Sequence, residues 1–513
     1  MEGLTYFLDG LLTIGSDPIA LFAVLWATLL GMAVGMMPGL TATLGVALLT
    51  TLTFRMAPGD AILILICMYV GAIYGGSRSA ILLNIPGTPA NAASALDGFP
   101  MARAGRAGEA LVLSTAGSAI GTVIGLIALA LVAPLLAEFA LSFGSFEFFW
   151  LAVFGIIISG HLTAIDNPVK GWIAGFLGLL LATVGQEGIH AYQRFSYGWT
   201  DLAGGIGLLP ALVGAFGFAE ILSVMKARRY DVLRDMGSAA LPKLRTLWGY
   251  RRTLFRSGIL GTLMGLIPGV GEDMGAWSSY AAARRASREK AQFGKGSREG
   301  LLASETGNNA AVPGALIPVL VLAVPGSAPA AVLLAALLIH GIRPGPLIMI
   351  ESPAFVFEVA GMLLFAAIGI LVLGLALTRP LLTVLSVPRE RLMPIVFVLC
   401  TVGAFAIASR VFDIWVMLAM GLVGFALREM KYPMAPLVLG IVLGDILDKS
   451  LRRGMTLTDG SFEPFLTRPI SIVLWLACLA TILFSFSAVR RVAGNGLRRL
   501  LPGRRGDTDK DQT

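Results

Sequence analysis

The sequence predicts an all-α polytopic membrane protein with roughly ten to fourteen transmembrane segments, arranged as two inverted-topology repeats. Composition, long apolar runs and a repeated Pro-Gly pattern lead to this prediction. Of the 513 residues 56% are hydrophobic and only 14% are charged, and the mean hydropathy is +0.81. A soluble domain is about 25% charged, so an ordinary soluble enzyme is excluded. The apolar runs do not alternate with polar residues as the strands of a membrane β-barrel would.

The apolar runs follow one another along the whole chain, and about twenty apolar residues are needed for a helix that crosses a bilayer. They lie at 18–37, 40–54, 59–83, 109–137, 146–163, 168–185, 202–224, 258–283, 309–325, 328–341, 352–378, 392–409, 412–427, 433–447 and 469–488. Several are too short to cross alone, so neighbours such as 18–37 and 40–54 are expected to form hairpins or broken helices. Residues 1–17 contain neither Lys nor Arg, so no cleavable signal peptide is expected.

Basic residues concentrate in four segments: around Arg103 and Arg106, at 225–257, at 284–298 and in the tail. The positive-inside rule places these segments, and with them the C-terminus, in the cytoplasm, and the N-terminus on the outer side of the membrane. The net charge of +8 therefore fits membrane orientation better than nucleic-acid binding. The expected units are a first transmembrane repeat (1–224), a basic cytoplasmic linker (225–257), a second repeat (258–488) and a cytoplasmic tail (489–513).

The run at 258–283 has basic segments on both sides, so we expect it to enter and leave the membrane on one face. Pro268 and Gly269 lie near its middle, where a hairpin would turn. The alternative is a proline-kinked helix with one flanking segment assigned to the wrong side.

An internal repeat is the strongest pattern in the chain. The segment GMAVGMMPG at 31–39 recurs as GTLMGLIPG at 261–269, with matching glycines and prolines 230 residues apart. Further on, IPGTPA at 85–90 recurs loosely as VPGSAPA at 324–330. Because the two copies follow segments on opposite sides of the membrane, the halves are expected to have inverted topology. Interrupted hydrophobic segments at matching positions of inverted repeats indicate the binding site of a secondary transporter.

The prolines are expected to break helices at membrane depth, either as broken helices or as re-entrant hairpins. Freed backbone N–H groups at a helix N-terminus can hold an anion, and freed carbonyls can hold Na⁺. We therefore predict substrate-binding residues at Ser77, Arg78, Ser79, Asn84, Pro86, Gly87, Thr88, Asn91, Glu305, Asn308, Asn309, Pro325, Gly326 and Ser327. Ion-coupling residues are predicted at Pro38, Gly39, Thr41, Thr43, Pro268, Gly269 and Gly271.

Structural explanations of these residues stay open beside the functional ones. A GxxxG pair is commonly a helix-packing face, Ser and Thr often bond to their own helix, and Asn84 could start a turn before Pro86. Asn308 and Asn309 either line the site or serve packing. No cofactor or metal motif is present, so the coupling ion, Na⁺ or H⁺, is the one expected ligand besides the substrate.

Several blocks resemble the large membrane subunit of tripartite tricarboxylate transporters, the TctA-type permease family. They span nearly the whole chain and comprise YGGSRSAILLNIPGTP at 74–89, LDGFPMA at 96–102, FGKG at 293–296, NNA at 308–310, GALIP at 314–318, PGS at 325–327, IHGIRPGP at 339–346 and FLTRPI at 465–470. The resemblance implies import of citrate-like di- or tricarboxylates, driven by an ion gradient, across the bacterial inner membrane. It also implies two partners, a small TctB-type membrane subunit and a periplasmic TctC-type solute-binding protein.

Two positions depart from the family pattern. The block before the paired asparagines reads SETGNNA at 304–310, where the family resembles PEAANNA, so Glu305 is kept but its neighbours differ. Arg78 stands where a small or apolar residue is expected. A buried arginine needs a partner, and either a substrate carboxylate or a nearby acidic side chain could be that partner.

Two other functions are alternatives to a secondary transporter. An intramembrane aspartyl enzyme would use Asp445 or Asp448 with a second facing aspartate, but Asp166 and Asp413 lack a supporting motif and Asp448 beside Lys449 suggests a charge pair. An ABC-type or channel-like permease is the other alternative; the chain has no Walker A motif, although a separate ATPase subunit could supply one.

Overall fold

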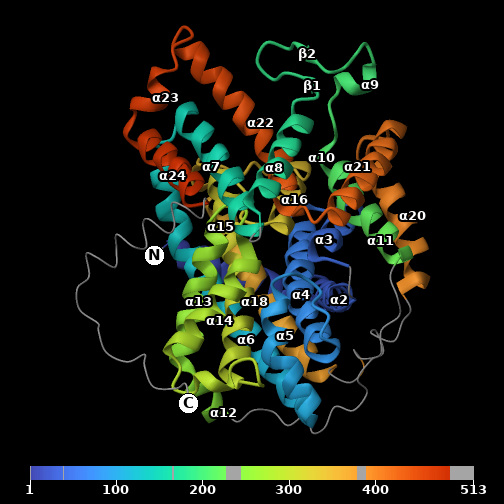
Figure 1. Ribbon diagram of the computed structural model, residues 1–513, viewed down its shortest axis with the longest axis vertical. Helices are drawn as coiled ribbons and strands as arrows, with labels where there is room; N and C mark the ends of the chain where they lie inside the picture. Colours follow the sequence, from blue (N-terminus) through green and yellow to red (C-terminus); the bar gives the residue numbers. More distant parts are fainter. Residues whose placement is uncertain are drawn as a thin grey trace, which may run out of the picture.

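The computed structural model consists almost entirely of helices (Figure 1). It describes residues 2–37, 40–164, 167–226, 244–377, 380 and 389–485. Within these ranges eight helices are long and apolar enough to cross a membrane, and four shorter apolar helices accompany them. The predicted fold class, an all-α polytopic membrane protein, is therefore confirmed.

The first half of the chain contains eleven α-helices, two wide helical turns and one small hairpin of strands among the described residues. The helices are α1 (Glu2–Ser16), α2 (Pro18–Met36), α3 (Ala42–Thr53), α4 (Pro58–Leu83), α5 (Asn91–Met101), α6 (Ala107–Ala140), α7 (Ser145–Thr163), α8 (Pro168–Ala182), α9 (Thr200–Ala203), α10 (Leu208–Leu212) and α11 (Ala219–Lys226). The wide turns are η1 (Ala102–Arg106) and η2 (Val213–Phe218), and strands β1 (Gly185–Gln186) and β2 (Gln193–Arg194) pair antiparallel.

The second half is helical throughout its described residues. Its elements are α12 (Leu244–Gly249), α13 (Arg251–Leu266), α14 (Gly271–Ala286), η3 (Lys290–Gln292), α15 (Arg298–Leu322), α16 (Ala328–Ile339), α17 (Ile348–Glu351), α18 (Pro353–Ala376), α20 (Arg389–Ala408), α21 (Val411–Glu429), α22 (Met434–Leu457), α23 (Glu463–Thr467) and α24 (Pro469–Ser485). Helix α13 begins at Arg251, so part of the basic segment expected as a linker is helical.

Both Pro-Gly segments interrupt helices, as predicted. Helix α4 ends at Leu83, and its cap Asn84 adopts left-handed geometry with φ of 56°. Helix α15 ends at Leu322, and its cap Ala323 does the same with φ of 55°. The chain then runs without helix through each proline until α5 and α16 begin. Proline disfavours helical geometry in the residue before it and lacks an N–H donor, which accounts for both breaks.

Helices α4 and α15 form the buried centre of the molecule. In α15 every residue from Gly300 to Leu322 is buried, and α4 is buried from Ala61 to Leu82. The GxxxG pairs pack directly against these two helices: a Cβ atom on Gly31 would lie 3.0 Å from the amide nitrogen of Ala72, and one on Gly265 would lie 2.8 Å from that of Ala315. The packing explanation of both GxxxG pairs is therefore confirmed.

The two halves repeat one further contact. A Cβ on Gly87 would meet the carbonyl oxygen of Gly35, and a Cβ on Gly326 would meet that of Gly265. Each break glycine thus packs on the second glycine of its own GxxxG pair. Only a residue without a side chain allows this approach, so the local geometry of the breaks is shared by both halves.

The predicted turn near Pro268 is a helical hairpin. Helices α13 and α14 are separated by a short turn in which Gly269 has φ of 72°, and Ser279 Oγ on α14 donates a hydrogen bond to the Ser257 carbonyl on α13 at 3.2 Å. The alternative of one kinked helix is wrong, because the left-handed glycine reverses the chain rather than bending it.

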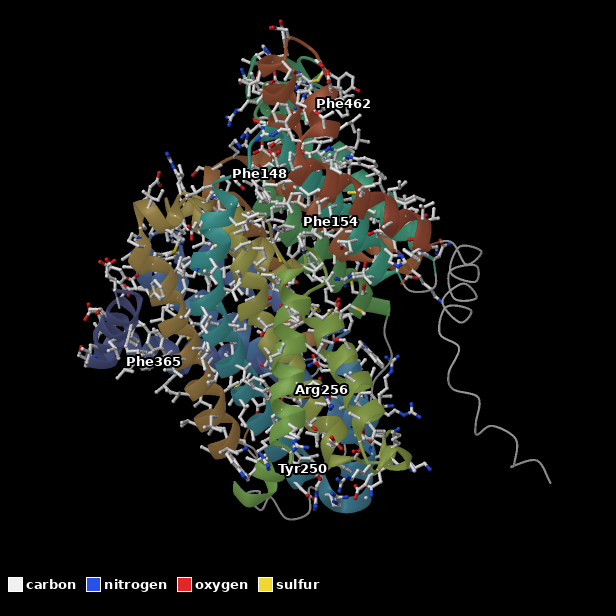
Figure 2. All side chains as sticks on the ribbon, turned by 90° about the vertical axis from the view of Figure 1, so that its left-hand side faces the viewer. Phe148, Phe154, Tyr250, Arg256, Phe365 and Phe462 are labelled. Atoms are coloured by element: carbon white, nitrogen blue, oxygen red, sulfur yellow. The ribbon has the colours of Figure 1, made fainter. Side chains whose placement is uncertain are left out.

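The basic segments that the structure describes meet at one end of the molecule. Arg298 and Arg106 both pair with Glu109, at 2.5 and 2.8 Å, and Thr253 on α13 donates to Glu299. Figure 2 shows Tyr250, just before α13, at this end and Phe462 at the opposite end. This arrangement agrees with a common side for three of the four basic segments; the tail lies outside the described residues.

Candidate functional site

The first break carries a compact network of polar side chains. Asn91, at the start of α5, accepts hydrogen bonds from the Thr88 N–H at 3.1 Å and the Thr88 hydroxyl at 2.6 Å. Its amide nitrogen donates to Ser77 Oγ at 2.8 Å and to the Ile73 carbonyl at 3.1 Å. Asn91 therefore ties the break to the middle of α4, and these three predicted residues lie together.

The second break joins the two halves. Ser327 caps α16, and its hydroxyl lies 2.7 Å from the hydroxyl of Tyr69 on α4 and 3.1 Å from a carboxyl oxygen of Glu272 on α14. Tyr69 also donates to the same carboxyl oxygen. Gly271 is adjacent, since a Cβ there would lie 2.5 Å from the Cβ of Ser327. A predicted substrate residue and a predicted ion-coupling residue thus share one site.

Tyr69 and Glu272 were not predicted. Glu272 had a sequence signal, because it is an acidic residue directly after the hairpin turn of an apolar segment. Tyr69 had none: it lies inside an apolar run, and only the packing of α4 against α14 and Ser327 brings its hydroxyl to the site.

The polar face of α15 lies opposite α5 and α6. Ser94 on α5 donates to Ser304 at 3.2 Å, and Ser118 on α6 donates to Glu305 at 2.9 Å. Asn309 donates to Ser118 Oγ at 2.9 Å. Asn308 differs from these residues, because it is fully buried and neither amide atom has a partner among the described residues. A buried amide without partners is rare and indicates a ligand, ion or water.

Arg78 is buried without an acidic partner among the described residues. Its guanidinium donates to the Tyr74 hydroxyl and to the Gly374 carbonyl, both at 2.5 Å from Nη2, and Nη1 has no partner there. Pairing with a nearby acid, one of the two predicted explanations, is therefore not observed. Its neutral partners lie on α4 and α18, which makes Arg78 a link between these helices.

The remaining predicted residues have mainly backbone roles. Ser79 donates to the Gly76 carbonyl of its own helix, Thr41 caps α3, and Thr43 is buried on α3. Pro86, Pro325 and Pro268 lie in the helix interruptions, and the Gly269 carbonyl accepts a hydrogen bond from Ser159 at 3.2 Å. Pro38 and Gly39 lie outside the described residues.

Helices that follow the breaks pack across the boundary between halves. Ala90 and Ala93 at the start of α5 share an apolar cluster with Ala276 on α14, and α16 packs against α3. The first residues of α5 and the cap of α16 therefore both lie against α14, through the Ala90–Ala276 cluster and the contact of Gly271 with Ser327.

Charged residues near the end of α22 are paired with basic side chains. Asp448 bonds to Arg194 at 2.9 Å and to Arg452 at 3.1 Å, whereas Lys449 pairs with Asp445. The expected pairing of Asp448 with Lys449 is wrong, because residues four apart share a helix face and adjacent residues do not. Asp166 lies outside the described residues. No group of three or more His, Cys, Asp or Glu side chains that could hold a metal ion occurs in the described ranges.

Comparison with known proteins agrees with the resemblance. Residues 21–439 match the family described as "Tripartite tricarboxylate transporter TctA family". An uncharacterized 52.8 kDa protein in the TAR-I ttuC' 3' region of Agrobacterium vitis is 35% identical over 464 residues, which are 89% of this chain and 91% of that protein. An uncharacterized protein in the TAR-II ttuC' 3' region of the same organism is 31% identical over 231 residues, 45% of this chain and 96% of that protein. No solved structure matches the chain.

Proposed function

The chain belongs to the tripartite tricarboxylate transporter TctA family, and we propose that it imports a citrate-like di- or tricarboxylate across the bacterial inner membrane. Family membership makes it the large subunit of such a transporter and not an enzyme. In the proposal, a periplasmic solute-binding protein delivers the substrate, a small membrane subunit accompanies the chain, and a gradient of Na⁺ or H⁺ drives uptake by symport. The N-terminus is periplasmic and the C-terminus cytoplasmic.

The observation that carries the proposal is the buried, unpartnered amide of Asn308 on α15. An unsatisfied buried amide is unfavourable by about 1–3 kcal/mol, which a ligand accepting its N–H would remove. Asn308, Thr88 and Ser327 hydrogen-bond the substrate carboxylates, with Asn84 and Asn309 beside them.

The repeat supports the placement of Asn308. Asn84 and Ala323, Gly87 and Gly326, and Thr88 and Ser327 are each 239 residues apart. At the same spacing Tyr69 corresponds to Asn308. Because Tyr69 contacts Ser327 at 2.7 Å, Asn308 should face Thr88 in the equivalent arrangement. Glu272 provides the carboxyl group beside Tyr69 and Ser327. In the proposal, the substrate provides the carboxylate beside Asn308 and Thr88.

We propose alternating access as the transport mechanism. In this proposal the two halves have inverted topology, and movement of one half against the other opens the substrate site to either side of the membrane. Coupling ions at the Pro268–Gly271 hairpin neutralise the substrate, since an uncompensated multivalent anion is prohibitive in lipid.

The test is uptake of labelled citrate and other di- and tricarboxylates by cells and by vesicles. The double substitution Asn308→Ala and Asn309→Ala should abolish uptake while membrane insertion, checked by the amount of protein in membranes, stays normal. Near-normal uptake would remove both residues from the site. Vesicles with an imposed ion gradient and no ATP should accumulate substrate; a strict ATP requirement would support an ABC-type permease instead.

A further inference from the structure

A second buried carboxyl group lies away from the Tyr69–Glu272–Ser327 contact. Glu305 on α15 faces Ser114 and Ser118 on α6, in a group that also includes Thr306 and Asn309 and that we name the Glu305 cluster. Ser118 Oγ donates to one Glu305 carboxyl oxygen at 2.9 Å, and Asn309 donates to Ser118 Oγ. All five side chains are fully buried, each with an exposure of 0%.

Glycines on α6 bring the two helices together at this place. A Cβ on Gly117 would lie 3.1 Å from the Cβ of Glu305 and 3.4 Å from the hydroxyl of Thr306, and a Cβ on Gly121 would meet the Thr306 carbonyl oxygen. Because no side chain separates the helices, the polar groups of both lie in one narrow layer. The hydroxyls of Ser77 and Ser94 also approach the Glu305 carboxyl group.

The Glu305 cluster has more oxygen atoms than donors to satisfy them. Glu305 Oε1, Asn309 Oδ1, Thr306 Oγ1 and Ser114 Oγ have no hydrogen-bond partner among the described residues. No ion pair formed by the described basic side chains includes Glu305. A carboxylate in this position would therefore be a buried charge without a counter-ion, which is strongly unfavourable.

We propose that the Glu305 cluster binds a monovalent cation of the size of Na⁺. A bound proton would neutralise the carboxylate but add one donor to a group with four unpaired oxygens, whereas a hard cation takes several oxygen ligands at once. A single carboxylate with neutral oxygens matches a charge of +1, and a divalent cation would keep an excess positive charge. A second carboxylate, from the substrate, would be repelled by Glu305 unless a cation lay between them.

The position of the cluster links it to the proposed function, on which its role as a coupling site rests. Asn309 belongs to the cluster, and the preceding residue, Asn308, is the proposed substrate ligand. Ser77 approaches Glu305 and accepts a hydrogen bond from Asn91 at the first break. A cation here would neutralise Glu305 and order side chains that continue to the substrate site.

Binding can be tested without substrate or partner subunits. Thermal unfolding of the purified full chain in detergent is measured in NaCl, KCl and choline chloride at constant ionic strength. Sodium should raise the midpoint by a few degrees in a concentration-dependent way, because a ligand that binds only the folded state stabilises it. Glu305→Gln should abolish this shift, and Ser114→Ala with Ser118→Ala should move it to at least tenfold higher Na⁺.

The matched control is Asp97→Asn, which alters a buried carboxylate held by the backbone N–H groups of Gly294, Gly296 and Ser297 at 2.8–2.9 Å. It should lower the midpoint but keep the sodium shift. A sodium shift retained in Glu305→Gln, or a wild-type midpoint that responds to pH but not to Na⁺, would overturn the inference. A wild-type protein that takes up carboxylate but shows no sodium shift would reject the cation site alone. A wild-type protein that shows the sodium shift but no carboxylate uptake would reject the proposed function.

Discussion

Asn308→Leu separates a functional role of Asn308 from a structural one. Asn308 and Asn309 are neighbours on a fully buried helix, but Asn309 donates to Ser118 and to the Glu305 carbonyl, while the amide of Asn308 has no partner in the described structure. Leucine has a similar shape and no polar atoms. Removing an unsatisfied amide should therefore stabilise the protein by about 1–3 kcal/mol.

The same replacement at Asn309 should have the opposite effect on stability. Asn309→Leu loses two hydrogen bonds and leaves Ser118 with one donor fewer, so it should destabilise the protein by about 1–3 kcal/mol. Both variants should lose citrate-like uptake. For Asn308→Leu, loss of hydrogen bonds to a charged ligand should lower the initial uptake rate at limiting substrate by at least about tenfold.

The assay combines thermal unfolding midpoints of purified protein in detergent with initial uptake rates, normalised to the amount of protein in the membrane. The expected pattern is a higher midpoint with lower uptake for Asn308→Leu, and a lower midpoint for Asn309→Leu. If Asn308→Leu unfolds at a lower temperature than wild type, and its uptake falls only as much as the amount of folded protein does, Asn308 has hydrogen-bond partners within the protein. The reasoning from its unpartnered amide would then be refuted.

Three further outcomes are expected. Gly87→Ala places a Cβ 2.7 Å from the Gly76 Cα and against a backbone carbonyl. It should therefore reduce the amount of folded protein in membranes severalfold, measured by fluorescence-detected gel filtration. Tyr69→Phe removes a hydroxyl bonded to a carboxyl group and to Ser327, and should lower stability by about 1–3 kcal/mol and slow uptake, measured as above. Burial raises the pKa of Asp448, but hydrogen bonds from two arginines outweigh it and hold the pKa below its usual range. The stabilisation that ionised Asp448 gives is therefore complete above its unfolded pKa of about 3.9 and is lost as pH falls through the lower folded pKa. Asp448→Asn should destabilise the protein equally at pH 5 and pH 8. The difference in stability from wild type should vanish only in strong acid.

Each of these has a contradicting result. A normal yield of monodisperse Gly87→Ala would show that the break can move away from its partner helix. Wild-type stability and uptake in Tyr69→Phe would remove the hydroxyl from the site. A stability gap for Asp448→Asn that closes between pH 8 and 5 would show that the carboxyl group titrates at a higher pH than its arginine partners imply.

The breaks, the hairpin and the polar face of α15 were predictable, because each depends on local chemistry. At 86 and 325 a proline directly before glycine disfavours continuation of the helix, and Pro268-Gly269 between two basic segments has to reverse the chain. The residues that these elements contact were harder to predict from the sequence. Ser114 and Ser118 resemble any hydroxyl residues of an apolar helix until glycines bring α6 against α15.

Contacts between residues far apart in the sequence explain the other features that were not predicted. Arg78 is paired with a hydroxyl and a backbone carbonyl rather than an acid, and its contact with Gly374 spans 296 positions of the chain. Helix α1 was not expected at all, since residues 1–17 are only partly apolar; it is held by α18, where Tyr6 and Phe357 lie with ring centroids 6.3 Å apart. Neither arrangement has a short-range signal.

The burial of α15 has a consequence for how the protein is made. This helix is covered along its whole length, yet it is not among the eight helices apolar enough to cross a membrane on their own. Glu305, Asn308 and Asn309 make its transfer from the translocon into lipid unfavourable. It can enter the bilayer only when α5 and α6, both synthesised earlier, already cover its polar face. Biogenesis of this permease must therefore proceed by joint rather than helix-by-helix insertion.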